Sequence, residues 1–205
     1  MATDSHALIT TPSAAKWYGA FDATSAKQEI DIEVQGSLEW LPCETIVFDK
    51  ACVASEINIG LGSDARMLGW DLLIFGRQGS GERFVTGVFD QSVKLVLQGE
   101  IVWIDRLRLV GSDPLFDSSI GLAGQSALAT FWAVAPDSAP WTEGHMEVVR
   151  SFSPEIAWTC LHPRLLVGRQ VGCPILMQKR LQHAWRFLKQ TYWGLAAPSL
   201  RLWAT

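Results

Sequence analysis

Alternating polar and apolar residues predict β-strands over most of the first half of the chain. From Gln28 to Val34 every second residue is apolar, which is the period of an antiparallel strand with one exposed face. The segment Ala7–Tyr18 predicts a short strand followed by a proline turn and a mixed segment. Other apolar or alternating runs, separated by glycine-containing turns, predict strands over Cys52–Leu61, Arg66–Arg77, Arg83–Leu97 and Glu100–Leu109. Strands that follow one another without intervening helices indicate an antiparallel all-β body.

The stretch Glu39-Trp-Leu-Pro-Cys-Glu-Thr-Ile-Val-Phe-Asp49 combines strand-like residues with a proline. Residues 45–48 are β-branched or aromatic and suit a pleated sheet. A proline inside an extended pattern interrupts backbone pairing, so Pro42 predicts a strand, a sharp turn or bulge, and a second strand. Glu39 and Glu44 are then expected near the kink.

The clearest helix lies near the C-terminus. Between Pro174 and Trp193 apolar residues recur three or four positions apart on one face, while Arg186 and Lys189 complement the negative end of the helix dipole, and Gly194 follows as a stop signal. Residues 126–134 fit a strand or a helix. The remaining expectations are a short helix over Trp141–Val149, a strand over Ala157–Val167 and a final strand over Ser199–Thr205. The predicted fold class is mainly β, an antiparallel or mixed sheet scaffold with one or two helices.

Length and charge narrow the class of protein. A chain of 205 residues fits one domain. The formal charge of −4, from 17 basic and 21 acidic residues without a block of like charge, gives no support to binding of nucleic acid or an anionic membrane. No run approaches the roughly 18 apolar residues of a membrane span. The start lacks the regions of a signal peptide, so we expect a cytoplasmic protein.

Cysteine and tryptophan are the notable uncharged residues. Four cysteines without a secretory signal predict free, mostly buried thiols. Ten tryptophans are spread along the whole chain, and core packing is the expected role for most of them.

Three short motifs resemble known sites but lack a necessary residue. Gly76–Glu82 is glycine-rich, yet Glu82 stands where a phosphate loop needs lysine. Ser126 lacks the closing glycine of a nucleophile elbow. Cys160 and His162 are too few for a structural zinc site. We therefore expect no catalytic triad and no closed metal cage.

Two carboxylates occur inside apolar strands. Asp71 and Asp105 are costly to bury unless each has an arginine or backbone partner or lines a wet cavity. We favour pairing slightly over a cavity. The candidate counter-charges are Arg66, Arg77, Arg83, Arg106 and Arg108.

Several stretches taken in order resemble one protein family. They are Glu39–Asp49, Leu68–Arg77 with Gly81–Phe84, and Arg201–Thr205, supported by Leu8–Tyr18 and Arg106–Leu109. Together they resemble the UreD (UreH) urease accessory proteins over nearly the whole chain, as one domain covering residues 1–205.

The resemblance implies a β scaffold that joins a UreF-type protein and a UreG-type GTPase on apo-urease and helps nickel to reach the active site. It implies no enzyme activity and no tightly bound cofactor, only transient nickel. An ion in transit needs weak, dispersed oxygen ligands. On this basis Asp71, Glu82 and Asp105 are the first candidates to contact nickel, followed by Glu39 and Glu44.

The chain departs from the family pattern in three places. An upstream Gly-Gly-Asp segment is absent, so we expect sequence before Met1 to be missing. Cys43 replaces the usual glutamine and Asp105 the usual glutamate.

Two alternatives of other classes remain. One is a β-sandwich module that binds carbohydrate or peptide through exposed tryptophans. The other is a hydrolase that uses Asp71 and Glu82 as an acid–base pair.

Overall fold

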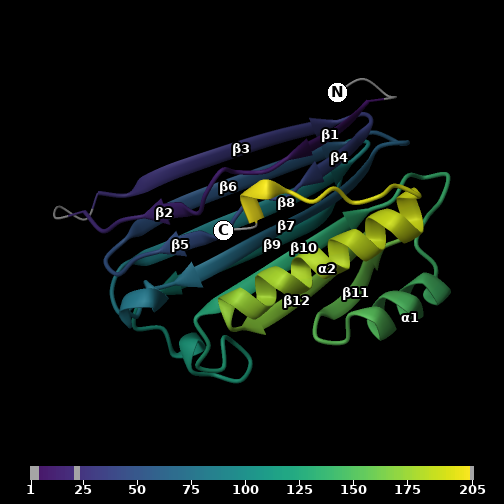
Figure 1. Cartoon of the computed structure of the whole chain (residues 1–205). Helices are drawn as coiled ribbons and strands as arrows, with labels where there is room; N and C mark the ends of the chain where they lie inside the picture. The colour runs from purple at the N-terminus through teal and green to yellow at the C-terminus, as the bar shows by residue number, and fades with distance from the viewer. Residues whose placement is uncertain (1–4, 21–23, 204–205) are drawn as a thin grey trace.

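Two β-sheets and a helical layer stack on one another in the computed structural model, which describes residues 5–20 and 24–203 (Figure 1). The smaller sheet contains β3 (Ala26–Val34), β6 (Cys52–Leu61), β8 (Val88–Leu97) and β9 (Glu100–Val110). The larger sheet contains β1 (His6–Ile9), β2 (Ala15–Trp17), β4 (Ser37–Trp40), β5 (Thr45–Val47), β7 (Arg66–Phe75), β10 (Ala127–Val134), β11 (Ala157–His162) and β12 (Leu165–Gly172). The helices are α1 (Glu143–Phe152) and α2 (Pro174–Trp193), with 3-10 turns η1 (Gln78–Ser80), η2 (Pro114–Phe116) and η3 (Arg201–Trp203).

The predicted fold class is confirmed, because strands dominate and the clearest helix has the predicted bounds. Cys173 precedes this helix, Pro174 begins it, and Gly194 ends it in the left-handed conformation with φ 66°. The ambiguous residues 126–134 form β10, and the single strand expected over 157–167 is two strands joined by a turn. The expected final strand is wrong, since 201–203 form η3, while residues 204 and 205 lie outside the described part.

Strand direction is the main correction to the antiparallel prediction. β3, β6 and β8 run parallel to one another, and β4 and β5 both run parallel to β7. The chain alternates between the two sheets as it passes from β3 through β8, so each return to the same sheet restores the same direction. Period-two alternation reports which face of a strand is buried, and it contains no information on the direction of the neighbouring strand.

Apolar side chains fill both spaces between the layers. The two helices cover the outer face of the larger sheet, where Trp185 of α2 joins Trp70 and Phe131 in one buried cluster (Figure 1). Between the two sheets the buried apolar residues form two separate clusters, one around Trp132 and the other around Phe89. What separates these two clusters is the basis of the candidate site.

Candidate functional site

A band of polar side chains crosses the interior between the two sheets. On each of seven strands one polar residue interrupts the inward-facing apolar positions. Paired strands bring six of these residues into adjacent positions. The seventh, on β9, is displaced by two residues and lies opposite Val93. We call this set the polar band. Its members are Gln28, Ser55, Gln91 and Asp105 on the smaller sheet, and Asp71, Thr130 and Arg169 on the larger sheet.

The polar band divides the core between the sheets. On β8, Phe89 belongs to one apolar cluster and Val93 to the other, with Gln91 between them. The same order is found on β6, where Val53 and Ile57 flank a buried polar residue. Burying a polar group costs free energy unless it is hydrogen-bonded, and apolar residues at these positions would avoid that requirement. The repetition of polar residues on successive strands therefore favours a functional role over a packing role.

Asp71 is the ionisable group at the centre of the band. Its carboxylate accepts a hydrogen bond of 2.8 Å from Nε2 of Gln91 across the space between the sheets. Burial raises the pKa of Asp71 to about 6; the bonds from Gln91 and the Leu72 backbone oppose this rise, and the charge of Asp105 adds to it. The carboxyl group of Asp71 therefore changes between its protonated and its charged form close to neutral pH.

A cavity of about 140 Å³ lies along one half of the band, from Gln28 at its end to Asp71 at its centre. Ser55, Gln91, Thr11 and Cys43 are among the residues that line it. This volume holds several water molecules, each of which occupies about 30 Å³ in the liquid. Asp71 therefore lines a cavity and also has a backbone partner, Leu72, so both of the expected alternatives apply to it.

The cavity exists because the strands beside β7 are broken at this level. β4 ends at Trp40 and β5 begins at Thr45, as the kink at Pro42 predicts, and the neighbouring pair β1 and β2 is interrupted at the same level. Trp70 donates a hydrogen bond of 2.8 Å from its indole to the Pro42 carbonyl, which holds the gap in place. The kinked stretch thus shapes one end of the polar band.

Asp105 lies toward the other end of the band, near the surface. It pairs with Arg169 of β12, which links the two sheets, and the Arg169 side chain is 45% exposed. None of the expected counter-charges is its partner. Arg108, three residues further along β9, faces outward and pairs with Asp90 at 3.7 Å. Side chains alternate between the two faces of a strand, so residues an odd number of positions apart point to opposite faces.

Glu39 lies on the opposite face of the larger sheet and is fully buried. Its carboxylate accepts hydrogen bonds from Trp185, from Lys189 at 2.8 Å and from His6 at 2.6 Å. Lys189 was expected to complement the helix dipole, but it is buried and turned toward Glu39. This cluster ties β1, β4 and α2 together.

Glu82 and Glu44 are also outside the polar band. Glu82 accepts a hydrogen bond of 3.0 Å from the Asp49 backbone and pairs with Arg77 at 3.3 Å, so it fastens the loop after β7. Glu44 is half-buried in the interruption between β4 and β5, where its carbonyl accepts from the Ala15 backbone. Asp71 and Glu82 are not brought together, which removes the basis for an acid–base pair.

The tryptophans and cysteines differ in part from expectation. None of the ten tryptophans is an exposed side chain, so the aromatic platform required by the carbohydrate-binding alternative is not present. All four cysteines are free, as expected, but only Cys43 is buried, while Cys160 and Cys173 are exposed.

Sequence reasoning identified only two of the seven band residues, Asp71 and Asp105. The others are Gln28, Ser55, Gln91, Thr130 and Arg169. Their common signal is a single polar residue that breaks the apolar positions of one strand face, and it becomes a site only when the strands are aligned.

No group of three or more histidine, cysteine or acidic side chains arranged to hold a metal occurs in residues 5–20 and 24–203. Across the same residues, no helix has the length and apolar character required to cross a membrane.

Fold and site together define a two-sheet β scaffold whose interior contains an ionisable polar band. A family model described as UreD urease accessory protein matches residues 1–204. Urease accessory protein UreD of Pseudomonas savastanoi pv. phaseolicola is 36% identical over 208 residues, covering 98% of this chain and 72% of the relative. The protein of the same name in Pseudomonas fluorescens Pf0-1 is 37% identical, covering 97% of this chain and 71% of the relative. The urease accessory protein UreD of Acinetobacter baumannii AYE is 39% identical over 150 residues, covering 71% of this chain and 51% of the relative.

The chain belongs to the UreD urease accessory protein family. Its role is therefore an accessory one in urease maturation, which involves urease and other urease accessory proteins. Family membership implies a maturation factor that is itself non-catalytic.

Proposed function

We propose that this protein assists the insertion of nickel into urease, with the polar band as a route for the ion through its interior. In the same proposal it acts in the cytoplasm as a scaffold that joins a UreF-type protein and a UreG-type GTPase to apo-urease. The observation that carries the proposal is the row of polar side chains between two apolar clusters, centred on the buried Asp71.

The chemistry of the band suits a cation in transit. It offers the carboxylates of Asp71 and Asp105, the amide oxygens of Gln28 and Gln91, and hydroxyl oxygens. These ligands come from different strands and are dispersed along the band, so each holds a cation weakly, whereas a compact cage would retain it.

Two features regulate passage in this proposal. Asp71, with its pKa of about 6, gains or loses a proton near neutral pH, so an arriving cation readily displaces the proton. At the other end, Arg169 pairs with Asp105, and a cation must displace this guanidinium to use the carboxylate. Arg169 would thus limit access from the surface until a partner protein or the ion draws it away.

The test is the nickel content of urease purified after co-expression of the urease operon with and without this chain. The chain should raise the nickel content, and Asp71→Asn should lower this gain several-fold, because an amide cannot supply negative charge. Asp90→Asn is the matched control, since Asp90 is half-exposed on the outer face of the smaller sheet. Equal nickel content with and without the chain would contradict the proposed role. Equal content for the two variants would contradict the route through Asp71.

A further inference from the structure

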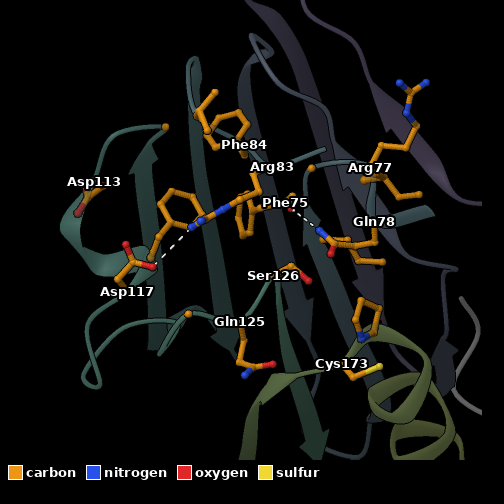
Figure 2. Close-up of a pocket in the computed structure, with 18 of the residues that line it drawn as sticks. Phe75, Arg77, Gln78, Arg83, Phe84, Asp113, Asp117, Gln125, Ser126 and Cys173 are labelled. Carbon is orange, nitrogen blue, oxygen red and sulfur yellow. Dashed lines mark hydrogen bonds and ion pairs between the residues drawn. The ribbon is translucent and has the colours of Figure 1, made fainter. Parts of the chain in front are cut away.

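A second, larger cavity of about 790 Å³ lies beyond the end of β7 (Figure 2). Its walls come from the loop after β7, from residues 83–85, from the loop between β9 and β10, and from the start of α2. No member of the polar band lines it. Its volume is in the range of about 300–1,000 Å³ typical of ligand pockets, and it requires its own explanation.

The floor of this cavity is aromatic. Phe75, Phe84 and Phe116 pack against one another with ring centroids 5.5–6.0 Å apart. Ile46 and Ile74 extend the apolar lining. Such a floor favours large apolar side chains of a ligand, because their burial removes apolar surface from water.

Positive charge is available above this floor. Figure 2 shows Arg83 reaching across the cavity toward Asp117, with which it pairs at 3.5 Å. Their side chains are 72% and 78% exposed, and an ion pair so exposed contributes little stability. Arg83 can therefore exchange Asp117 for a carboxylate of a ligand at little cost.

The start of α2 adds a second preference for an anion. Cys173 precedes the helix without a side-chain cap, and its first turn contains no acidic residue. The backbone N–H groups of Ile175 and Leu176 therefore have no acceptor within the helix. Asp113 cannot serve them while its side chain caps η2 through the Leu115 backbone.

Exposed apolar side chains extend the surface beyond the cavity. They occur on each of three wall segments and are Val85, Leu115, Ile120, Ile175 and Leu176, which are 36–89% exposed. A small molecule held in the cavity would leave this rim in water. A protein segment covers both the floor and the rim.

We infer that this cavity is a docking pocket for an acidic, apolar segment of a partner protein. Its apolar side chains pack on the phenylalanine floor and the rim, and its carboxylate binds Arg83 and the N-terminal turn of α2. The inference does not depend on nickel transport through the polar band.

Peptide binding to the whole chain tests the inference. The probes are a panel of blocked synthetic peptides in which large apolar residues precede one aspartate, each matched by its asparagine counterpart, with affinity measured by fluorescence anisotropy. Aspartate peptides should bind about tenfold more tightly than their counterparts. Arg83→Gln should remove this preference, whereas Asp117→Asn, which frees Arg83, should strengthen aspartate binding about threefold.

Arg108→Gln is the matched control, because Arg108 is also an exposed arginine in an ion pair but lies on the outer face of the smaller sheet. It should leave binding unchanged. Alkylation provides an independent readout, since Cys173 lines the cavity and Cys160 is an exposed thiol elsewhere. Bound peptide should slow alkylation of Cys173 alone. Equal binding of aspartate and asparagine peptides, equal effects of the two arginine variants, or no protection of Cys173 by any peptide would overturn the inference.

Discussion

Two buried carboxylates, Asp71 and Glu39, have opposite surroundings. Glu39 is neutralised by Lys189 and receives further hydrogen bonds from Trp185 and His6. Asp71 has a neutral hydrogen-bond donor, Gln91, and adjoins a cavity. A fully paired carboxylate serves to hold structural elements together, whereas one with only a neutral donor remains available to a cation.

Asp71 should make stability depend on pH. Burial raises its pKa from 3.8 to about 6 in the folded protein, so the folded state binds the proton more tightly than the unfolded state. The resulting stabilisation is full below about pH 4 and is lost as the pH rises through 6. Asp71→Asn should therefore be more stable than the natural protein at pH 7, by up to about 3 kcal/mol.

The measurement is urea unfolding of both proteins at a series of pH values. The difference between their free energies of unfolding should change between about pH 4 and 7, as the pH passes through the unfolded and the folded pKa, and be constant above that range. Asp90→Asn, at an exposed position, serves as the control. A difference that does not vary with pH would show that Asp71 has an ordinary pKa.

A second prediction at the scale of single residues concerns Lys189. Lys189→Met should destabilise the fold by about 3–5 kcal/mol, because it leaves the Glu39 charge buried without its main counter-charge. Lys179→Met, on the exposed face of the same helix, should change stability by less than about 0.5 kcal/mol. Combining Lys189→Met with Glu39→Leu should recover much of the loss. Urea unfolding of the natural protein, the single variants Lys189→Met and Glu39→Leu, and the double variant would reveal whether the pair is coupled.

At the scale of elements, β7 is the strand on which the other parts converge. It pairs with β4 and β5 on one side and with β10 on the other, and nine of its ten residues are buried. The sequence predicted this burial from the apolar run. It could not show that one face of β7 meets α2 and the other meets the smaller sheet, because both faces are equally apolar.

Replacing Gly69 tests the packing of β7 against β10. A Cβ atom at this position would lie 2.4 Å from Nε1 of Trp132, whose side chain is fully buried and cannot move aside without cost. Gly69→Ala should therefore destabilise the protein by about 1–3 kcal/mol. In Gly79→Ala the added Cβ atom would have no other atom within 4 Å, so this variant should have little effect on stability. Similar thermal unfolding midpoints for the two variants would contradict this account of the close approach.

At the scale of the whole molecule, the polar band lowers the stability of the fold. An uninterrupted apolar core between the sheets would avoid the cost of burying Asp71 and Gln91. Their position between two apolar clusters is the reason for assigning them a role in ion passage in our proposal.

Replacing both partners of this hydrogen bond should separate stability from function. The double variant Asp71→Leu with Gln91→Leu should be at least as stable as the natural protein, because removing both polar groups leaves neither unsatisfied. It should nevertheless fail to raise the nickel content of co-expressed urease. Normal nickel content in a folded double variant would argue against the band as the route.

The sequence by itself determined the strands of the first half, the kink at Pro42, the bounds of α2 and the motifs that resemble the UreD family, because each depends on local periodicity or on a few adjacent residues. Only the tertiary structure decided the direction of the strands, the pairing of Asp105 with Arg169, and the burial of Glu39 with Lys189. The physical reason is that these features join residues far apart in the chain, and they arise as the chain alternates between two sheets. The polar band depends on both sequence and tertiary structure. Each strand carries one polar residue among apolar ones, and only the stacking of the two sheets brings these polar residues together.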